Sequence, residues 1–406
     1  MTFYQLSYNK PMKQSVKNIS LVSITNLINL GLGVLLFLAV AIKLPKEEFG
    51  VYGLLTLLLV SLSKIIDFGS NSTFVSEFIG KGKNYLNELV NFKILAFVFT
   101  VLLSFLILKY VNKITDIQIV VSFTLGLFFY GVNYLLFALF QKDEEFIKAS
   151  LLNFFPALIK GAFGVLIIFD MFKINLTNSF QIFSLSMIAS AFLLPLKFQD
   201  LKKFQFNFNI KHFISNFYLA GMSQIINESW NTISNQILKL IRSLTDLGTF
   251  SLASKLSNVF SVISYSIYTV ILASNAKRKK ESLGYNLYES LILGLFLLLL
   301  ASVGSIISPL FFNAVFGNKF NESILIFSVL LFSQAFASIH KFLDNYFFIE
   351  EKSKTLFLLT NIKLVLFVTL SYFLTSTYGL IGLATADLIS SITITIVTFI
   401  YIIKNR

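Results

Sequence analysis

Five polar residues recur at helical spacing within one long apolar stretch of the sequence. They occupy relative positions 0, 3, 4, 7 and 11, which lie on one face of a helix, and they are Gln224, Asn227, Glu228, Asn231 and Asn235. A carboxylate among carboxamides can take up a proton where water is scarce, or supply oxygen ligands to a hard cation such as Na⁺. The stripe therefore predicts a hydrated cavity wall in which Glu228 binds a coupling ion. The alternatives are hydrogen bonds from this face to a neighbouring helix and an ion pair of Glu228 with Lys64 or Lys255.

Charged residues also interrupt other apolar stretches. A charge at the centre of a bilayer costs at least ~2.5–3.5 kcal/mol, so such residues usually face a cavity or a partner. Lys64, Lys160 and Lys255 therefore predict cationic positions on a cavity. Asp67 lies three residues after Lys64 and is expected at the same cavity. The alternative is that Lys64 and Asp67 simply neutralise each other.

Two further lysines, Lys93 and Lys363, and Lys160 differ in their surroundings. Lys93 and Lys363 lie near enough to the end of an apolar stretch for their ammonium groups to extend to the interface. Lys160 is followed by Gly161 and Gly164, and small residues at this spacing allow a close approach of two helices.

Several kinds of site are excluded by the sequence. It has no cysteine and only two histidines, His212 and His340, which lie far apart, so we expect neither a disulfide nor a metal centre. It has no G-x-x-x-x-G-K-[ST] phosphate loop, and no cofactor is expected. The net charge of +13 is spread over short segments between apolar stretches, which fits attraction to anionic lipid rather than to nucleic acid.

The composition is that of a membrane protein. Hydrophobic residues make up 56% of the chain and charged residues 13%, whereas a soluble domain carries about a quarter charged residues. Apolar stretches of about 20 residues, the length that crosses a bilayer, number twelve and predict an all-α polytopic protein. The expected spans are 19–42, 51–79, 90–108, 117–140, 151–169, 177–196, 213–238, 248–274, 285–308, 323–348, 356–375 and 379–403.

A short pattern occurs twice in the chain, 198 residues apart. Residues 49–54 read FGVYGL and residues 247–252 read LGTFSL, each beside long apolar stretches. The same offset relates Asn26 to Gln224 and Asn29 to Asn227. Internal repetition in a membrane chain is typical of transporters, whose substrate site lies where the halves meet. We therefore expect two pseudo-symmetric six-helix bundles, 1–198 and 213–406, joined by a cytoplasmic linker at 199–212.

Basic residues predict the orientation of the spans. With the amino terminus inside, 19 lysines and arginines fall in the cytoplasmic segments and eight on the opposite side. Because short cytoplasmic loops are enriched in lysine and arginine, both termini are expected in the cytoplasm.

Short motifs occur along the whole chain, most of them near the ends of expected spans. They are residues 44–52 (LPKEEFGVY), 65–69 (IIDFG), 247–256 (LGTFSLASKL), 311–317 (FFNAVFG) and 378–384 (YGLIGLA). In this order they resemble Wzx-type flippases, the polysaccharide-transport branch of the multidrug/oligosaccharidyl-lipid/polysaccharide (MOP) exporter superfamily. Phe250 departs from the tyrosine that is common at its position in that family.

The resemblance implies a multi-pass protein of the bacterial inner membrane that is a transporter and not an enzyme. Its substrate would be undecaprenyl-diphosphate-linked oligosaccharide, moved from the cytoplasmic to the periplasmic leaflet by alternating access for O-antigen, capsule or another surface polysaccharide. Since the sequence has no ATP-binding motif, we expect the energy to come from an ion gradient (H⁺ or Na⁺), the membrane potential or the substrate's own gradient. A polysaccharide polymerase and a chain-length regulator would be its protein partners.

This substrate gives the polar residues distinct expected roles. Lys64, Lys160 and Lys255 would attract the diphosphate, while amide side chains bind sugar hydroxyls. The expected amides are Asn26, Asn29, Gln224, Asn227 and Asn231. A drug or cation antiporter of the same superfamily and a membrane polysaccharide polymerase are the alternative functions. The short external loops disfavour the polymerase, because such enzymes usually place their catalytic residues in a sizeable external loop.

Overall fold

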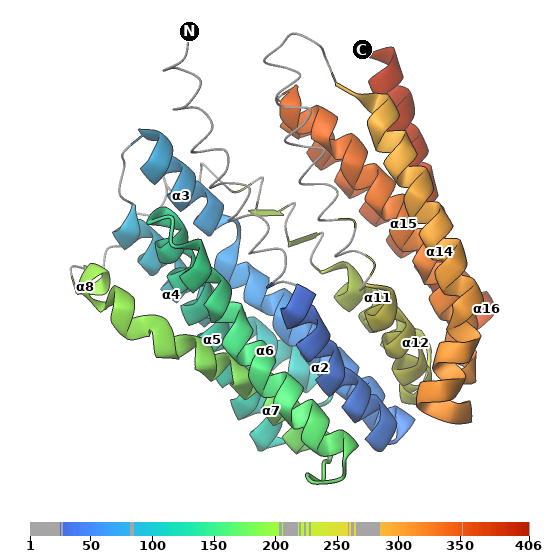
Figure 1. Cartoon of the computed structure of the whole chain (residues 1–406), viewed down its shortest axis with the longest axis horizontal. Coiled ribbons are helices and arrows are strands. Elements are labelled where there is room, and N and C mark those ends of the chain that lie inside the picture. Colours follow the sequence, from blue (N-terminus) through green and yellow to red (C-terminus); the bar gives the residue numbers. More distant parts are fainter. Residues whose placement is uncertain are drawn as a thin grey trace, which may run out of the picture. The chain divides into compact units, whose positions relative to one another are not determined.

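The structure is a computed structural model, and it describes most of the chain (Figure 1). The described residues are 25, 27–81, 85–202, 205, 218, 221, 222, 225, 226, 229–258, 260, 264, 285–350 and 352–405. Within them every regular element is helical and no strand occurs, which confirms the predicted all-α class.

The chain divides into two compact units. Unit 1 is Met1–Leu44 with Leu55–Glu228, and unit 2 is Pro45–Leu54 with Ser229–Arg406. Helix α2 (Lys46–Asp67) therefore contributes its first residues to unit 2 and the rest to unit 1. The expected linker at 199–212 falls in unit 1, and most of it lies outside the described residues.

Unit 1 is a bundle of apolar helices. Besides α2 and the apolar helix Leu27–Lys43, its elements are α3 (Ser70–Lys81), α4 (Leu86–Leu106), the π-helical η1 (Ile107–Val111), α5 (Ile117–Lys142), α6 (Phe146–Ile168), α7 (Leu176–Leu185), the 3₁₀-helical η2 (Ser186–Lys197) and α8 (Phe198–Leu201). Side chains mark where these helices begin. Asp116 accepts a hydrogen bond of 2.8 Å from the backbone of Gln118, and Asn175 and Asn178 form a reciprocal capping box.

Unit 2 combines the start of α2 with five longer helices and one short 3₁₀ segment among the described residues. They are α11 (Trp230–Ile241), α12 (Leu244–Ser257), α14 (Leu287–Phe316), η3 (Gly317–Phe320), α15 (Asn321–Ile349) and α16 (Ser353–Lys404). Helices α14, α15 and α16 pack side by side (Figure 1). Gly379 has φ of 65° and interrupts α16, so that α16 consists of two helical segments joined by a bend.

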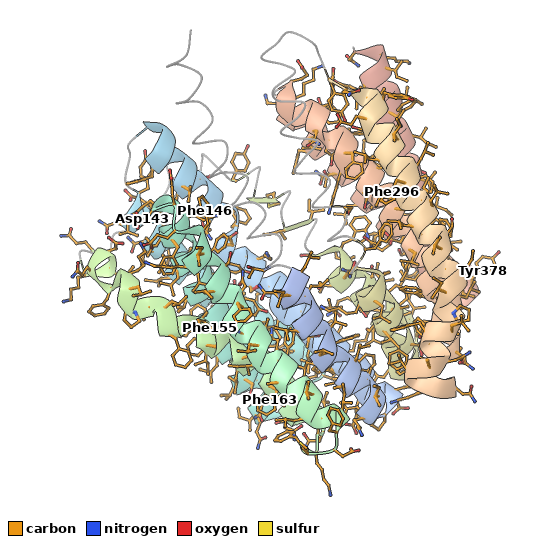
Figure 2. The ribbon with its side chains drawn as sticks, in the orientation of Figure 1. Asp143, Phe146, Phe155, Phe163, Phe296 and Tyr378 are labelled. Carbon is orange, nitrogen blue, oxygen red and sulfur yellow. The ribbon has the colours of Figure 1, made fainter. Side chains whose placement is uncertain are left out.

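Seven segments of the described chain are long and apolar enough to cross a membrane. Two of them, Leu287–Phe347 and Lys354–Lys404, are 61 and 51 residues long and each covers two of the expected spans. The first, seventh and eighth expected spans extend into residues that are not described. Large apolar side chains such as Phe296 project outward from the ribbon (Figure 2). The chain is a multi-pass membrane protein.

One expected span is interrupted. The sequence predicts a continuous helix over 51–79, but α2 ends at Asp67 and α3 begins at Ser70. Phe68 and Gly69 between them have φ of 44° and 75°. Glycine adopts this left-handed conformation without a steric penalty, so it allows the chain to change direction here.

The repeated pattern brings equivalent residues into contact within unit 2. A Cβ atom on Gly50 would lie 2.4 Å from the carbonyl oxygen of Leu244, and one on Gly248 would lie 2.3 Å from that of Lys46. The two contacts are equivalent, because Gly248 lies 198 residues after Gly50 and Leu244 lies 198 residues after Lys46. Thr245 Oγ1 donates a hydrogen bond of 3.3 Å to Glu47 Oε1, and these two residues are also 198 residues apart. Such reciprocal contacts are those of a local two-fold relation.

A second close approach lies in unit 1. A Cβ atom on Gly164 would come within 2.7 Å of the backbone nitrogen of Leu36, and one on Gly161 within 2.6 Å of Leu32 Cδ2. The predicted role of these two glycines in close helix packing is confirmed. Lys160 lies directly beside this contact.

Candidate functional site

Asp67 ends α2 as a buried carboxylate. Its exposed fraction is 8%, and the carbonyl end of a helix disfavours a negative charge. Lys93 from α4 compensates for both penalties, because its Nζ lies 3.5 Å from Asp67 Oδ1 and donates to Ser70 Oγ at 3.3 Å. The Ser70 hydroxyl in turn donates to the Asp67 carbonyl oxygen at 2.6 Å. The residues on either side of the break between α2 and α3, Asp67 and Ser70, thus both contact Lys93 in a buried ion pair.

Tyr134 of α5 connects this pair to Lys64. The ammonium groups of Lys64 and Lys93 lie 5.4 and 5.8 Å from the centre of its ring. Its hydroxyl lies 3.0 Å from Ser63 Oγ, and its backbone oxygen accepts a hydrogen bond of 2.9 Å from Asn71. These two hydrogen-bond contacts anchor Tyr134, and its ring lies within cation–π distance of both ammonium groups. We call Ser63, Lys64, Asp67, Ser70, Asn71, Lys93 and Tyr134 the unit 1 cluster.

The unit 1 cluster is cationic and unevenly exposed. It holds two lysines and one aspartate. Lys93 is buried with an exposed fraction of 5%, whereas Lys64 is half-buried. Lys64 is therefore the cation of the cluster that a ligand can reach more easily.

Lys160 occupies a separate position in unit 1. Its Nζ lies 4.2 Å from the centre of the Phe183 ring, a distance suited to a cation–π interaction. The contact joins α6 to α7, next to the glycine-mediated packing of Gly161 and Gly164.

A second cluster of charged residues is buried in unit 2. Trp230 Nε1 donates to Asp387 Oδ1 at 2.8 Å, and Ser333 Oγ donates to Asp387 Oδ2 at 2.8 Å. Lys363 Nζ lies 4.5 Å from the centre of the Trp230 ring, which stacks on Phe367 at 4.4 Å. Lys363 thus faces an aromatic ring inside the unit, whereas the sequence suggested that it extends to the interface. We call Trp230, Ser333, Lys363 and Asp387 the unit 2 cluster.

The expected polar stripe is described only in part. Asn235 is fully buried, and its Oδ1 accepts a hydrogen bond of 2.7 Å from Ser251 on α12. Asn231 Oδ1 accepts from Ser254 on the same helix at 3.4 Å. These two asparagines therefore join α11 to α12. A cavity role for Asn231 stays a prediction.

The remaining expected residues are distributed as follows. Lys255 is half-buried near the end of α12. Asn29 is half-buried, and among the described residues neither of its side-chain amide atoms has a hydrogen-bond partner. Four expected residues lie outside the described residues: Asn26, Gln224, Asn227 and Glu228.

Sequence reasoning missed the partners that complete both clusters. Lys93 was expected to extend to the interface, and Tyr134 and Trp230 carried no signal apart from their aromatic type. Asp387 and Lys363, two charged residues inside apolar stretches, were the available signs of the unit 2 cluster. Within the described chain, no group of three His, Asp or Glu residues is arranged to hold a metal ion.

Charged residues also meet at the end of unit 1 where α5 and α6 join, near Asp143 (Figure 2). Lys197 is ion-paired with Asp143 and lies 3.0 Å from Glu145 Oε2. Lys148 donates to Glu145 Oε1 at 2.6 Å, and this hydrogen bond is the main reason that the pKa of Glu145 is below its ordinary value.

Comparisons with known proteins agree with this architecture. The sequence profile of the family described as "Polysaccharide biosynthesis protein" matches residues 15–273. A search of curated protein sequences finds no match.

Solved structures share the fold of the chain. The lipid II flippase MurJ in an inward closed conformation is 16% identical, with 95% of this chain and 87% of that chain covered and a TM-score of 0.73. A MATE protein in complex with MaD3S is 15% identical, with 95% and 94% covered and a TM-score of 0.64. An inward-facing multidrug resistance MATE family transporter of the MOP superfamily is 15% identical, with 93% of each chain covered and a TM-score of 0.62.

Proposed function

The chain belongs to the polysaccharide biosynthesis protein family, and on this premise we propose that it is a Wzx-type flippase for a lipid-linked oligosaccharide. Its substrate is undecaprenyl-diphosphate-linked oligosaccharide, which it moves from the cytoplasmic to the periplasmic leaflet by alternating access. The product would serve the synthesis of O-antigen, capsule or another surface polysaccharide. The fold shared with a lipid II flippase supports the proposal, since that protein is by its name a flippase for a lipid.

The physical problem of such a substrate is its charged head group. The lipid tail remains in the hydrocarbon while the diphosphate and sugars cross, so the protein must offer the head group cations and hydrogen bonds within the membrane. An ATP-driven mechanism would need a nucleotide-binding site, and the sequence has no phosphate loop. A gradient of ions, or of the substrate itself, is therefore the expected energy source.

The observation that carries the proposal is the unit 1 cluster. In this cluster Asp67 pairs with Lys93, and the half-buried Lys64 lies with its ammonium group 5.4 Å from the centre of the Tyr134 ring. A lysine in this position attracts a diphosphate as a point charge, which suits a substrate that must also leave. Lys160 and Lys255 are proposed as further contacts of the same kind.

The polar amides are proposed to bind the sugars. Neither the amide nitrogen nor the amide oxygen of the Asn29 side chain has a hydrogen-bond partner among the described residues, so this side chain is suited to bind sugar hydroxyls. The same role is proposed for Asn26, Gln224, Asn227 and Asn231. Glu228 is proposed to couple the movement to an H⁺ or Na⁺ gradient. Transport by the Glu228→Gln variant under imposed gradients tests this role, which fails if the variant transports at the normal rate and still responds to the gradient.

The proposed setting is the bacterial inner membrane with both termini in the cytoplasm. Basic residues favour this orientation by 19 to eight. A polysaccharide polymerase and a chain-length regulator are the proposed protein partners, because they would act on the translocated units.

Depletion of the protein in cells tests the function. We expect the lipid-linked oligosaccharide to accumulate in the cytoplasmic leaflet and surface polysaccharide to fall, with unchanged susceptibility to cationic dyes. Increased dye susceptibility with normal polysaccharide export would instead support the drug or cation antiporter.

A further inference from the structure

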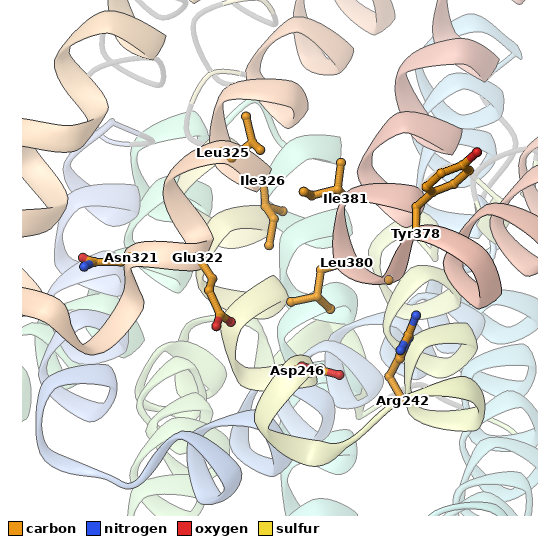
Figure 3. A pocket seen from close by; sticks show the side chains of 10 residues that line it. Arg242, Asp246, Asn321, Glu322, Leu325, Ile326, Tyr378, Leu380 and Ile381 are labelled. Atoms are coloured by element: carbon orange, nitrogen blue, oxygen red, sulfur yellow. The ribbon is translucent and has the colours of Figure 1, made fainter.

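A pocket of about 350 Å³ opens at one end of unit 2 (Figure 3). It lies where α12 and α15 begin and where α16 bends at Gly379. Charged groups of both signs surround an apolar floor; the residues that matter here are Arg242, Asp246, Glu322, Leu325, Leu380 and Ile381. In the view of Figure 3, Glu322 and Arg242 lie on opposite sides of Leu380. This pocket belongs to neither of the two clusters described above.

The exposed Arg242 side chain contacts the backbone of α16. Its Nε and Nη2 donate to the backbone oxygen of Thr375 at 3.3 and 2.9 Å, close to the bend of α16. Because a carbonyl end of a helix favours a cation, this contact stabilises both partners. A guanidinium has five N–H groups, so the side chain retains donors for an anion.

The charges around the pocket are not paired with one another. In the part of the chain that the structure describes, no ion pair within 4.0 Å joins Arg242 to Asp246 or to Glu322, although all three line the same pocket. Separated charges of opposite sign complement a ligand that carries both a negative and a positive group. An anion alone would be attracted only by the guanidinium, and a cation alone only by the two carboxylates.

The apolar floor continues onto an exposed apolar surface. Leu325 and Ile381 are 54% and 40% exposed, and they belong to segments that are apolar enough to span a membrane. Tyr378 at the rim is 70% exposed, and tyrosine is enriched at the depth of the lipid head groups. Helix ends that carry charges beside such a surface lie at this depth in a bilayer.

We propose that this pocket binds the head group of a zwitterionic phospholipid of the phosphatidylethanolamine type. The phosphate contacts Arg242, the ammonium group lies near Asp246 and Glu322, and the upper part of the acyl chains covers Leu325 and Ile381. An ammonium group with N–H donors suits two carboxylates better than a trimethylammonium group, since charge-assisted hydrogen bonds are the stronger interactions. The proposal goes beyond the proposed function and does not depend on it.

Native mass spectrometry of the purified, delipidated chain in an equimolar mixture of phosphatidylethanolamine and phosphatidylglycerol tests the proposal. Two partly exposed charge pairs predict a preference of roughly fivefold to tenfold for phosphatidylethanolamine. The Asp246→Asn/Glu322→Gln variant should reduce this ratio to about one, and Arg242→Gln should weaken the binding of both lipids. Glu48→Gln is the matched control, because Glu48 also lies in the first turn of a unit 2 helix but outside the pocket.

Two results would overturn the proposal. One is equal binding of the two lipids by the unmodified chain, and the other is an unchanged ratio in the double variant. The exposed position of Glu322 makes Glu322→Gln alone a conservative change, and it should lower the ratio about twofold to threefold. An unchanged ratio in this single variant would contradict the proposal even where the double variant does not fold.

Discussion

Gly50 and Gly248, which are 198 residues apart in the sequence, meet backbone to backbone. A Cβ atom on Gly50 would lie 2.8 Å from the nitrogen of Gly248, and one on Gly248 would lie 3.3 Å from the nitrogen of Gly50. The two copies of the repeated pattern therefore contact each other through equivalent residues, and each copy needs a residue without a side chain.

Substitution of Gly50 should test this contact. Gly50→Val inserts a side chain against rigid backbone, and overpacking of this kind typically costs about 1–3 kcal/mol. Thermal unfolding in detergent micelles should show a lower midpoint. Gly131→Ala is the control, because its new Cβ would meet only the Ile66 side chain, at ordinary distances of 3.5 Å from Cγ2 and 4.0 Å from Cδ1. An equal midpoint for Gly50→Val and the unmodified protein would contradict the close contact.

The buried pair of Asp67 and Lys93 predicts a marked loss of stability in Lys93→Met. Lys93→Met removes the close cationic partner of a buried carboxylate, and breaking a buried ion pair typically costs about 3–5 kcal/mol. Lys93→Met/Asp67→Asn should recover most of this loss, as measured by unfolding in detergent. If the single and double variants unfold alike, the pair does not stabilise the unit 1 cluster.

Trp230→Phe separates the two contacts of the Trp230 side chain. The phenyl ring retains stacking on Phe367, but Asp387 Oδ1 loses its donor, and an unsatisfied buried acceptor costs about 1–3 kcal/mol. In an Asp387→Asn background the same substitution should cost less, which a double-mutant cycle measures. Full additivity of the two changes would argue against the hydrogen bond.

Glu145 predicts a dependence of stability on pH. Its folded-state pKa is below the ordinary value of 4.5, so the folded protein favours its charged form. This contribution is fully present above the unfolded-state pKa and is lost as the pH falls through the folded-state pKa. Unfolding measured between about pH 6 and pH 3 should show a decline that Glu145→Gln lessens. Glu144→Gln, one residue away, should leave the decline unchanged, and equal effects of both variants would refute the assignment.

The sequence predicted the helical class, the presence of apolar helices long enough to cross a membrane and the close packing at Gly161 and Gly164, because these follow from local composition and spacing. The expected position of Lys64 and Asp67 at a substrate cavity stays a prediction. The sequence did not predict Lys93 as a partner of Asp67, since that contact depends on how α4 packs against the break after α2. Gly69 was a local sign of the break between α2 and α3, but the length of the apolar stretch favoured a single span over residues 51–79.

Lys64 is the residue through which the proposed function is most readily examined. Lys64→Ala should reduce head-group translocation by at least about tenfold, since a hydrogen bond between charged groups contributes about 1.5–3 kcal/mol, while Lys64→Arg should retain part of it. Protein levels in the membrane should be unchanged. Recovery of function in Lys64→Ala/Asp67→Asn would show instead that Lys64 acts only by neutralising Asp67.

The most direct test of the account is the rate at which the purified chain moves undecaprenyl-diphosphate-linked disaccharide across the bilayer of proteoliposomes. We predict movement well above that in protein-free vesicles, and a rate close to the protein-free level for Lys64→Ala. A rate for the unmodified chain equal to that of protein-free vesicles, with the protein folded and inserted, would contradict the proposed flippase function.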